Sequence, residues 1–365
     1  MANVKNFAVL GSGNGGRAFC GQIAARGYPV IMYEPLEETD DYRKLRVEKK
    51  MFLEGDIAVG GDLRGVSTDI QQVLQDADIV LIVVPSFAHR PIFQRMIPHL
   101  RDGQHVIIVP GNYGGLLLKK MMADLGVSVG VFISETASLP YACRISQYNT
   151  VMIHKKKFRM KLATSPAEGN FDALAVINDI FDGWVQFFGG NNLLEMGLDN
   201  INQILHPFPV LLNYGAIERH PDSFRHYMDG VTPLISETMI RMDHERLAVG
   251  RALGLDLMPT LDQLKMYYGE NDAQSYYEYV NSAQSPYKDI VGHSVRSRYI
   301  TEDVPGLLAP ALELARLVDV PVAVTELCVR LASVLHEVDY AADGTSLEKL
   351  GLAGKSAGQI LELAS

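Results

Sequence analysis

The glycine-rich stretch Gly11-Ser12-Gly13-Asn14-Gly15-Gly16 decides the fold of the amino-terminal half of this chain. It lies between an apolar run at residues 6–10 and a helical pattern over residues 14–26, and a second apolar run follows at residues 29–33. A G-x-G-x-x-G motif between a strand and a helix is typical of dinucleotide-binding βαβ units, because glycines allow a tight turn and close approach to a pyrophosphate. The pyrophosphate would meet the free N–H groups at the start of the helix.

Glu34 follows the second apolar run, 18 residues after Gly16. An acidic side chain at this point accepts hydrogen bonds from the adenosine ribose hydroxyls, which favours NAD over NADP. Arg43 and Arg46 lie downstream and could reach a 2′-phosphate, so NADP stays open. The alternative is a glycine-rich turn that only packs the helix on the strand. We expect Glu34 and all six residues from Gly11 to Gly16 to bind the cofactor.

Further short apolar runs predict a sheet that extends this unit. They lie at residues 78–84, 105–109 and 130–133, with helical patterns at 87–100 and 114–125. Continuous apolar strands that alternate with helices indicate a doubly wound, mainly parallel sheet covered on both faces, an α/β Rossmann domain. Residues 149–196 are expected to add strands and a helix near 171–182, so that this domain spans residues 1–197.

The carboxyl edge of such a sheet is where ligands bind. Val84 and Pro85 end one predicted strand and are expected to contact the cofactor. The next strand ends in a glycine-rich turn, residues 110–114, which is either a nicotinamide contact or an ordinary loop.

From residue 198 the patterns become long and helical. They cover residues 199–218, 231–253, 259–268, 271–283, 306–318, 322–338 and 356–364. An all-α carboxy-terminal domain is therefore expected over residues 198–365, with the active site in a crevice between the two domains.

The composition excludes several classes of partner. A net charge of −10 argues against binding to nucleic acid, and the basic run at residues 154–159 is interpreted as a solvated strand or turn. Three widely spaced cysteines predict neither a disulfide framework nor a zinc site, and we expect no metal. No signal peptide or membrane-spanning apolar run is visible, so the protein is expected to be cytoplasmic.

The catalytic candidates lie in two segments of the helical half. Asn202 and His206 are four residues apart and would share a helix face. Histidine exchanges protons near neutral pH, which hydride transfer to a carbonyl or imine requires. The alternative for His206 is a core histidine beside the helix-bending Pro207.

The second segment, residues 293–306, carries Arg298 and Asp303 before a predicted helix. Arginine is the preferred bidentate partner of a carboxylate, and an aspartate can orient a histidine. A surface salt-bridge segment is the alternative. The remaining histidines of the helical half are interpreted as surface residues; they are His220, His226, His244 and His336.

These segments together resemble the octopine/nopaline (opine) dehydrogenase family. The resemblance covers the whole chain and is carried by Gly11–Gly16, by Asn202…His206-Pro207, and most specifically by residues 298–305. It implies that the protein uses NADH or NADPH to couple a 2-oxo acid, such as pyruvate, to the amino group of an amino acid. The product would be a secondary amine with two carboxylates.

The same resemblance implies roles for individual residues. His206 would be the acid–base group and Asp303 its partner, favouring the imidazolium. Arg298 would bind a substrate carboxylate, and Asn202 would help to place the substrate. The segment 136–144 resembles the substrate-side loop of the family, with Thr136 and Cys143 as substrate contacts.

Two other functions remain as alternatives. One is a hydroxy-acid or ketopantoate-type dehydrogenase, which usually relies on a catalytic lysine; here the first lysine after residue 198 is Lys265. The other is an NAD-binding sensor without chemistry. The tyrosine-rich run at residues 267–279 fits an amine pocket, core packing or an oligomer surface, and a homodimer is compatible with the sequence.

Overall fold

The computed structural model describes residues 5–34, 39–283, 285–288, 290–291 and 294–365. The chain forms two compact units, Met1–Met196 with Ser365, and Gly197–Ala364. The division falls within helix α7 (Leu193–Leu198). Each unit is described by itself.

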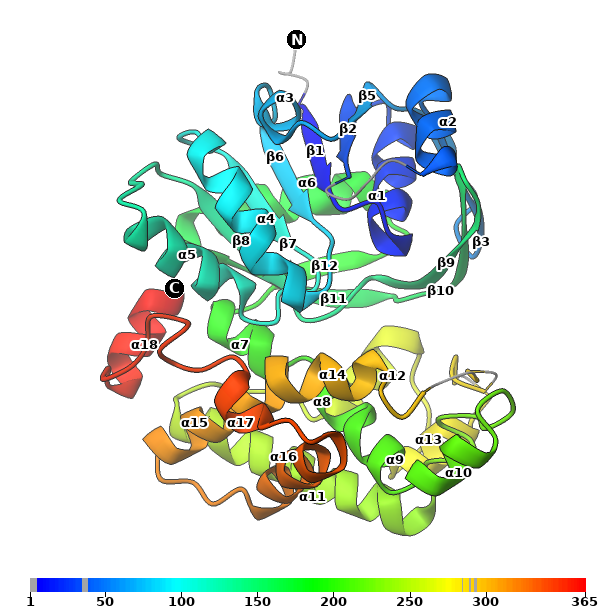
Figure 1. Cartoon of the computed structure of the whole chain (residues 1–365), viewed down its shortest axis with the longest axis vertical. Helices are drawn as coiled ribbons and strands as arrows, with labels where there is room; N and C mark the ends of the chain where they lie inside the picture. The colour runs from blue at the N-terminus through cyan, green and yellow to red at the C-terminus, as the bar shows by residue number, and fades with distance from the viewer. Residues whose placement is uncertain (1–4, 35–38, 284, 289, 292–293) are drawn as a thin grey trace. The chain divides into compact units, whose positions relative to one another are not determined.

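The first unit is built on an eight-stranded sheet in the order β12-β11-β8-β7-β6-β1-β2-β5 (Figure 1). Its strands are β1 (Phe7–Leu10), β2 (Val30–Tyr33), β5 (Gly65–Ser67), β6 (Ile79–Ile82), β7 (His105–Ile108), β8 (Phe132–Thr136), β11 (Arg159–Ser165) and β12 (Gln186–Gly189). All neighbours are parallel except β11, which runs antiparallel to β8. Every residue of β1, β6 and β7 is buried, as expected for strands covered on both faces. The predicted α/β fold class is confirmed.

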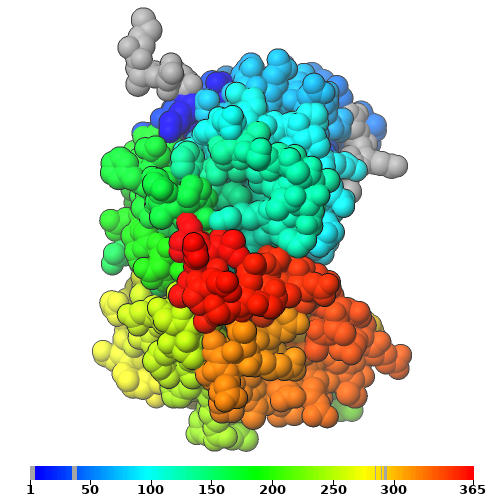
Figure 2. Space-filling model, turned by 90° about the vertical axis from the view of Figure 1, so that its left-hand side faces the viewer, coloured from blue at the N-terminus to red at the C-terminus, as the bar shows by residue number. Residues whose placement is uncertain are grey.

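Helices cover both faces of this sheet. They are α1 (Asn14–Ala25), α2 (Asp40–Glu48), α3 (Ile70–Leu74), α4 (His89–Met96), α5 (Gly114–Asp124) and α6 (Asn170–Phe181). Helix α4 contacts both α3 and α5 on one face, and α4 and α5 form the outer surface in cyan and teal in Figure 2. Helices α1 and α6 contact each other through an edge-to-face pair of Phe19 and Phe181, 5.6 Å between ring centroids.

A second, four-stranded sheet lies against α1 and was not predicted. Its order is β4-β3-β10-β9, with β3 (Lys50–Gly55), β4 (Gly60–Asp62), β9 (Tyr141–Gln147) and β10 (Thr150–Lys156). Gly21 of α1 lets this sheet approach, since a Cβ there would lie 3.1 Å from the Leu53 side chain. The strands are half exposed and mix polar with apolar residues, so they lack the continuous apolar runs that marked the main sheet.

The interpretation of residues 154–159 as a solvated basic run is wrong for Lys157. Its side chain is buried, and its Nζ donates a hydrogen bond to the Ser138 hydroxyl at 2.5 Å. Its backbone N–H donates to the Pro140 carbonyl at 2.9 Å. Burial lowers the pKa of Lys157 to about 7, because desolvation disfavours the charged amine.

The secondary structure described for the second unit is all helical. Its elements are α8 (Asn202–Leu205), α9 (Pro207–Leu211), α10 (Tyr214–Arg219), α11 (Pro233–Ala252), α12 (Thr260–Tyr268), α13 (Tyr276–Asn281), α14 (Arg298–Thr301), the π-helix η4 (Val304–Leu308), α15 (Ala309–Leu317), α16 (Ala323–His336), α17 (Tyr340–Asp343) and α18 (Ala357–Ala364). Local caps set some boundaries. The Thr232 hydroxyl accepts the Ile235 N–H before α11, and Ser275 caps α13 in the same way.

One helix of this unit differs from the prediction. A single helix over residues 199–218 was expected, and the structure divides it into α8, α9 and α10. Pro207 and Pro209 lack the N–H that a continuous helix needs, and the break falls at His206. The chain still makes the turn from Asn202 to His206, whose N–H donates to the Asn202 carbonyl at 3.1 Å.

Replacing Lys157 by Met should change how stability depends on pH. Folding lowers the pKa of this amine to about 7, whereas an unfolded lysine titrates near roughly 10.4. Between these values the unfolded chain binds a proton that the folded chain does not, so this residue makes the free energy of unfolding rise with pH. Lys157→Met should remove that rise, at most about 1.4 kcal/mol per pH unit.

Urea unfolding of the wild type and Lys157→Met at pH 7, 8 and 9 measures this difference. The control is Lys156→Met, which alters a half-buried lysine of the same run. Parallel pH dependences of the wild type and Lys157→Met would contradict the prediction.

Candidate functional site

The glycine turn between β1 and α1 accepts only glycine at two positions. Gly11 has a φ of +117°, and a Cβ there would lie 2.5 Å from the Val83 carbonyl oxygen. A Cβ on Gly16 would lie 1.9 Å from the Gly11 carbonyl oxygen. Gly13 is different, since it is exposed at the start of α1 and a Cβ on it would meet nothing within 4 Å. The backbone is therefore approachable at the position where a pyrophosphate would meet the helix N-terminus.

Three predicted cofactor residues lie at the same edge of the sheet as this turn. Strands β2, β1 and β6 are neighbours and parallel, so their carboxyl ends coincide. Val84 follows β6, and its Cγ1 would lie 2.7 Å from a Cβ on Gly11. Glu34 follows β2, and Pro85 is exposed beyond Val84. This edge fits a dinucleotide by its open backbone and its terminal acid.

Two residues of the motif also have structural partners. The Asn14 side-chain oxygen accepts the Ile145 N–H of β9 at 2.8 Å. The buried Ser12 offers its carbonyl to Nε of Arg17 at 2.8 Å, and the same guanidinium donates to the Tyr148 carbonyl. Burial lowers the pKa of Arg17, and the nearby Asp41 and Glu34 oppose this. The first turn of α1 is thus fastened to the second sheet.

A buried acid supports the glycine-rich turn at residues 110–114. Glu135 of β8 is fully buried and accepts hydrogen bonds from the N–H groups of Gly115 and Tyr113. Burial raises the pKa of Glu135 to about 8, and the two N–H groups oppose this. A Cβ on Gly111 would lie 1.9 Å from the Glu135 carboxylate, which explains the glycine in this turn. Sequence reasoning missed Glu135, because it lies beyond the apolar run at residues 130–133, in the polar end of β8.

The predicted substrate-side residues of this unit lie in two sheets. Thr136 ends β8, is buried and donates its hydroxyl to the Ser138 carbonyl at 2.8 Å. Ser138 also receives the hydrogen bond from Lys157. Cys143 is buried in β9, opposite Ile153 of β10. The structure therefore groups Thr136 with Ser138 and Lys157, while Cys143 belongs to the second sheet.

In the helical unit, His206 is held from three sides between α8 and α9. Its Nδ1 is 2.7 Å from a carboxylate oxygen of Asp303, and its Nε2 is 3.1 Å from the Tyr227 hydroxyl. The ring of Tyr299 stacks on the imidazole at a centroid distance of 3.7 Å and an angle of 14°. His206 is 6% exposed and Asp303 4%. The arrangement can hold and deliver one proton in a desolvated setting.

The segment with Arg298 and Asp303 supplies the acid of this pair. Arg298 opens α14 and is exposed, whereas Asp303 lies between α14 and η4 and is buried. Burial raises the pKa of Asp303 to about 8, and the Arg298 guanidinium opposes this. His293, the first residue of the predicted segment, lies outside the described residues. Asn202 is half buried one helical turn before His206.

The interpretation of all four remaining histidines as surface residues is wrong for two of them. His226 and His336 are 0% and 3% exposed, whereas His220 and His244 are exposed. His226 contacts the Leu205 carbonyl through Nε2 at 3.3 Å, and His336 lies between the Tyr340 hydroxyl and the Val295 carbonyl. Their rings pack among tyrosines, which the charged sequence around them concealed.

The tyrosine-rich run serves mainly as core. Four tyrosines of the run are buried, whereas Tyr277 is 41% exposed; the buried ones are Tyr267, Tyr268, Tyr276 and Tyr279. Tyr268 meets Tyr287, which stacks on Tyr227 at 4.3 Å, so this core extends to the partner of His206.

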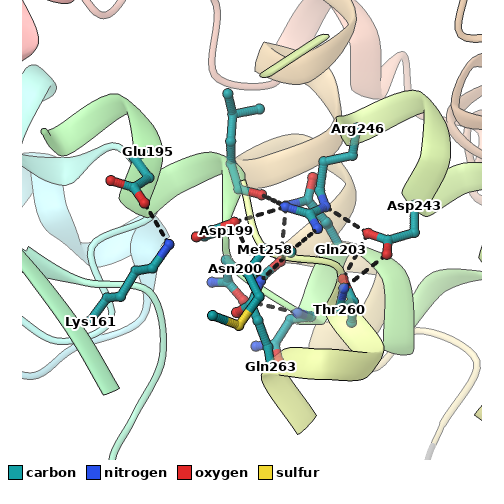
Figure 3. Close-up of polar contacts among 12 residues, drawn as sticks. Lys161, Glu195, Asp199, Asn200, Gln203, Asp243, Arg246, Met258, Thr260 and Gln263 are labelled. Carbon is teal, nitrogen blue, oxygen red and sulfur yellow. Dashed lines mark hydrogen bonds and ion pairs between the residues drawn. The ribbon is translucent and has the colours of Figure 1, made fainter. Parts of the chain in front are cut away.

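A buried ionic network fixes the chain that leads to His206 (Figure 3). Arg246 of α11 contacts Asp199 at 2.9 Å and Asp243 at 2.8 Å, and it donates to the Leu198 and Met258 carbonyls. Gln203 of α8 donates to the Leu198 carbonyl at 2.6 Å. Figure 3 also shows the ion pair of Lys161 and Glu195 in the first unit, at 2.5 Å. Because the charges of the network are paired and hydrogen-bonded, it can be buried without an isolated charge.

Metal-ligand clusters and membrane-spanning helices are both absent from the described part of the chain. No group of three or more His, Cys, Asp or Glu side chains among them is placed to hold a metal ion. No described helix combines the length and the apolar character needed to cross a bilayer. The three cysteines are buried and unpaired by disulfides.

Comparison with known proteins identifies the family. A family model described as NAD/NADP octopine/nopaline dehydrogenase, alpha-helical domain, matches residues 189–336, and one described as NAD-dependent glycerol-3-phosphate dehydrogenase N-terminus matches residues 6–121. An opine dehydrogenase from Arthrobacter sp. (strain 1C) is 33% identical over 368 residues, with 99% of each chain covered. The chain belongs to the opine dehydrogenase family.

Solved structures agree with this opine dehydrogenase fold. A structure of octopine dehydrogenase with NADH and L-arginine has a TM-score of 0.79 at 19% identity and covers 98% of each chain. A yersinopine dehydrogenase with NADP+ bound has a TM-score of 0.77 at 15% identity and covers 100% of this chain and 98% of that one. Family membership confirms the predicted resemblance and an NAD(P)-dependent oxidoreductase, and it favours this reading over the ketopantoate-type and sensor alternatives.

Two glycine variants of this opine dehydrogenase should separate cofactor binding from folding. Gly13→Ala adds a Cβ that meets no other atom, so its melting temperature should match the wild type. The same methyl group would obstruct the pyrophosphate, and NADH should bind at least roughly ten-fold more weakly, a loss of about 1.4 kcal/mol. Gly16→Ala forces a clash with the Gly11 carbonyl and should cost roughly 1–3 kcal/mol of stability as well.

Thermal unfolding and NADH fluorescence titration measure the two effects. Tight NADH binding by Gly13→Ala would show that the cofactor does not approach this turn.

Proposed function

We propose that this protein couples a 2-oxo acid, such as pyruvate, to the amino group of an amino acid and reduces the product with NADH or NADPH. The amine adds to the carbonyl carbon, water leaves to give an imine, and a hydride and a proton convert the imine into a secondary amine with two carboxylates. The observation that carries the proposal is the buried pair of His206 and Asp303, in the region matched by the family's helical-domain model.

The proton shared by His206 and Asp303 suits the condensation. The raised pKa of Asp303, about 8, means that the pair retains a proton at neutral pH. With that proton on the ring, His206 is an imidazolium beside a carboxylate; with it on Asp303, the ring is neutral and protonated at Nε2. Nε2 carries an N–H in both forms, so it can donate to the oxo-acid oxygen as water leaves. After donation, Nε2 can accept a proton in the reverse direction.

The remaining residues bind and orient in this proposal. Arg298 offers an exposed guanidinium next to Asp303, which suits bidentate binding of a substrate carboxylate. Asn202, Thr136 and Cys143 are proposed as further substrate contacts. Orientation of this kind replaces a multi-component encounter by a positioned step, which is worth several kcal/mol.

The cofactor would be held by the glycine turn, Val84, Pro85 and Glu34. The reduced nicotinamide supplies the hydride when it is bound. Glu34 ends β2 and carries an acid suited to the ribose hydroxyls of NAD, so we propose NAD as the preferred cofactor, with NADP also accepted. The proposed partners are small molecules, without nucleic acid or membrane; a homodimer stays a prediction.

The proposed reaction can be tested by leaving out one substrate at a time. Purified protein with pyruvate and a panel of amino acids should oxidise NADH only when both substrates are present, because hydride reaches the imine and not the oxo acid. Absorbance at the NADH band measures this, with NADPH in parallel. Turnover with the oxo acid alone, unchanged by any amine, would refute the proposed condensation.

Removing the acid–base group should greatly slow turnover without unfolding the protein. His206→Asn should lower kcat by roughly 10²–10⁴, the usual contribution of general acid–base catalysis, and leave NADH affinity unchanged. The matched control is His244→Asn, since His244 is exposed on α11. Wild-type rates in His206→Asn would place the chemistry elsewhere.

The two directions of the reaction should respond oppositely to pH. Since burial raises the pKa of Asp303 to about 8, the pair loses its proton as pH rises through this region. Reductive kcat should therefore fall above about pH 8, and oxidation of the purified product by NAD should rise. Profiles of both directions from pH 6 to 10 measure this; parallel profiles would contradict the role of the pair.

A further inference from the structure

Tyr227 lies at the one ring nitrogen of His206 that faces away from Asp303. It belongs to the turn at residues 224–230 before α11, is 2% exposed, and places its hydroxyl 3.1 Å from Nε2. The turn is fixed by the ion pair of Arg225 and Asp229 and by the His226 N–H, which donates to the Ile290 carbonyl at 3.0 Å. Tyr227 is therefore held in place by its own turn.

The direction of this hydrogen bond follows from the neighbours of Tyr227. Burial raises the pKa of Tyr227 well above its usual value, so the phenol keeps its single proton. The Tyr299 hydroxyl is a second hydrogen-bond partner of Tyr227 and can accept this proton. The Tyr227 oxygen then accepts the proton that His206 carries on Nε2.

The stacked ring of Tyr299 also favours the protonated form of His206. Its face lies on the imidazole at 3.7 Å, and an aromatic face attracts a cation. Two further titratable groups lie near the ring: Asp303, which accepts from Nδ1, and His226, whose ring centroid lies 6.0 Å away. Arg298 acts on the ring through Asp303.

We propose that Tyr227 is a positioning residue for the opine dehydrogenase reaction: its hydroxyl oxygen keeps Nε2 of His206 protonated until the oxo acid arrives, and so sets the pH at which the pair works as an acid. The inference rests on the proposed role of His206. Both ring nitrogens have partners inside the helical unit, so a substrate oxygen must share or take over the bond to Tyr227. Losing that bond should weaken the protonated form while the ring stays in place.

The variant Tyr227→Phe tests this with a matched control. It keeps the ring that stacks on Tyr287 at 4.3 Å and removes only the hydroxyl. Reductive kcat should fall about five-fold at pH 8 and recover near pH 6.5. The alkaline limb, set by the pair whose pKa is about 8, should move down by about one pH unit, the size expected for a hydrogen bond to a charged group. Tyr287→Phe removes a buried hydroxyl from the same stack and should keep the wild-type profile.

A second measurement does not depend on turnover. In protein labelled with ¹⁵N-histidine, with His206→Asn for assignment, the pH midpoint of the His206 ring should be lower in Tyr227→Phe and unchanged in Tyr287→Phe. Tyr299→Phe serves if Tyr227→Phe does not fold. It keeps the stacked ring but removes the acceptor of the Tyr227 proton, which then turns towards Nε2, so its midpoint should also fall.

The outcomes separate this inference from the proposed function. An equal loss of kcat at every pH with an unchanged His206 midpoint would overturn it, because Tyr227 would then act on the substrate directly. Unchanged kinetics and midpoint would overturn it as well, while an inactive His206→Asn would leave the function standing. A shifted midpoint in a protein without opine activity would support the Tyr227 contact and refute the function instead.

Discussion

The 2.7 Å contact between His206 and Asp303 sets the demands that the helical unit has to meet. A carboxyl that is 4% exposed loses its hydration, and its pKa rises to about 8 as a result. The low polarity of the surroundings strengthens the hydrogen bond between Asp303 and His206. It also raises the free-energy cost if either group loses its partner. The paired charges around Arg246 hold Leu198 and Asp199, a few residues before His206, and so limit the freedom of this segment.

The main sheet and the helical half were predictable because each leaves a simple pattern. Buried parallel strands such as β6 and β7 are continuous apolar runs, and the glycine motif fixed the first turn. The second sheet was missed because its strands are half exposed and mix polar with apolar residues. In addition, the pairing of β10 with β3 joins segments about a hundred residues apart. The single helix over 199–218 was wrong because the effect of Pro207 outweighed the apolar period.

The candidate site was predictable only where chemistry and spacing coincide. His206 and Asp303 were predicted from their residue types together with the family resemblance. Tyr227, Glu135 and Lys157 were missed because their environment depends on tertiary burial, which no local pattern records. Lys157 lies in a run of charged neighbours, yet it points inward to Ser138. Polar residues of this kind become visible only when the chain has folded around them.

Burial and the contacts with Tyr227 and Tyr299 have opposite effects on the protonation of His206. We propose that their balance sets the pH range in which the site works. Desolvation favours uncharged forms of the pair, whereas the Tyr227 oxygen and the Tyr299 face favour the imidazolium. An acid works best when it holds its proton at the operating pH but does not hold it much more tightly than the product does. Groups that contact the imidazole of His206 can therefore change the pH dependence of catalysis without touching the substrate. In this view the aromatic core around His206 contributes to the chemistry as well as to the packing.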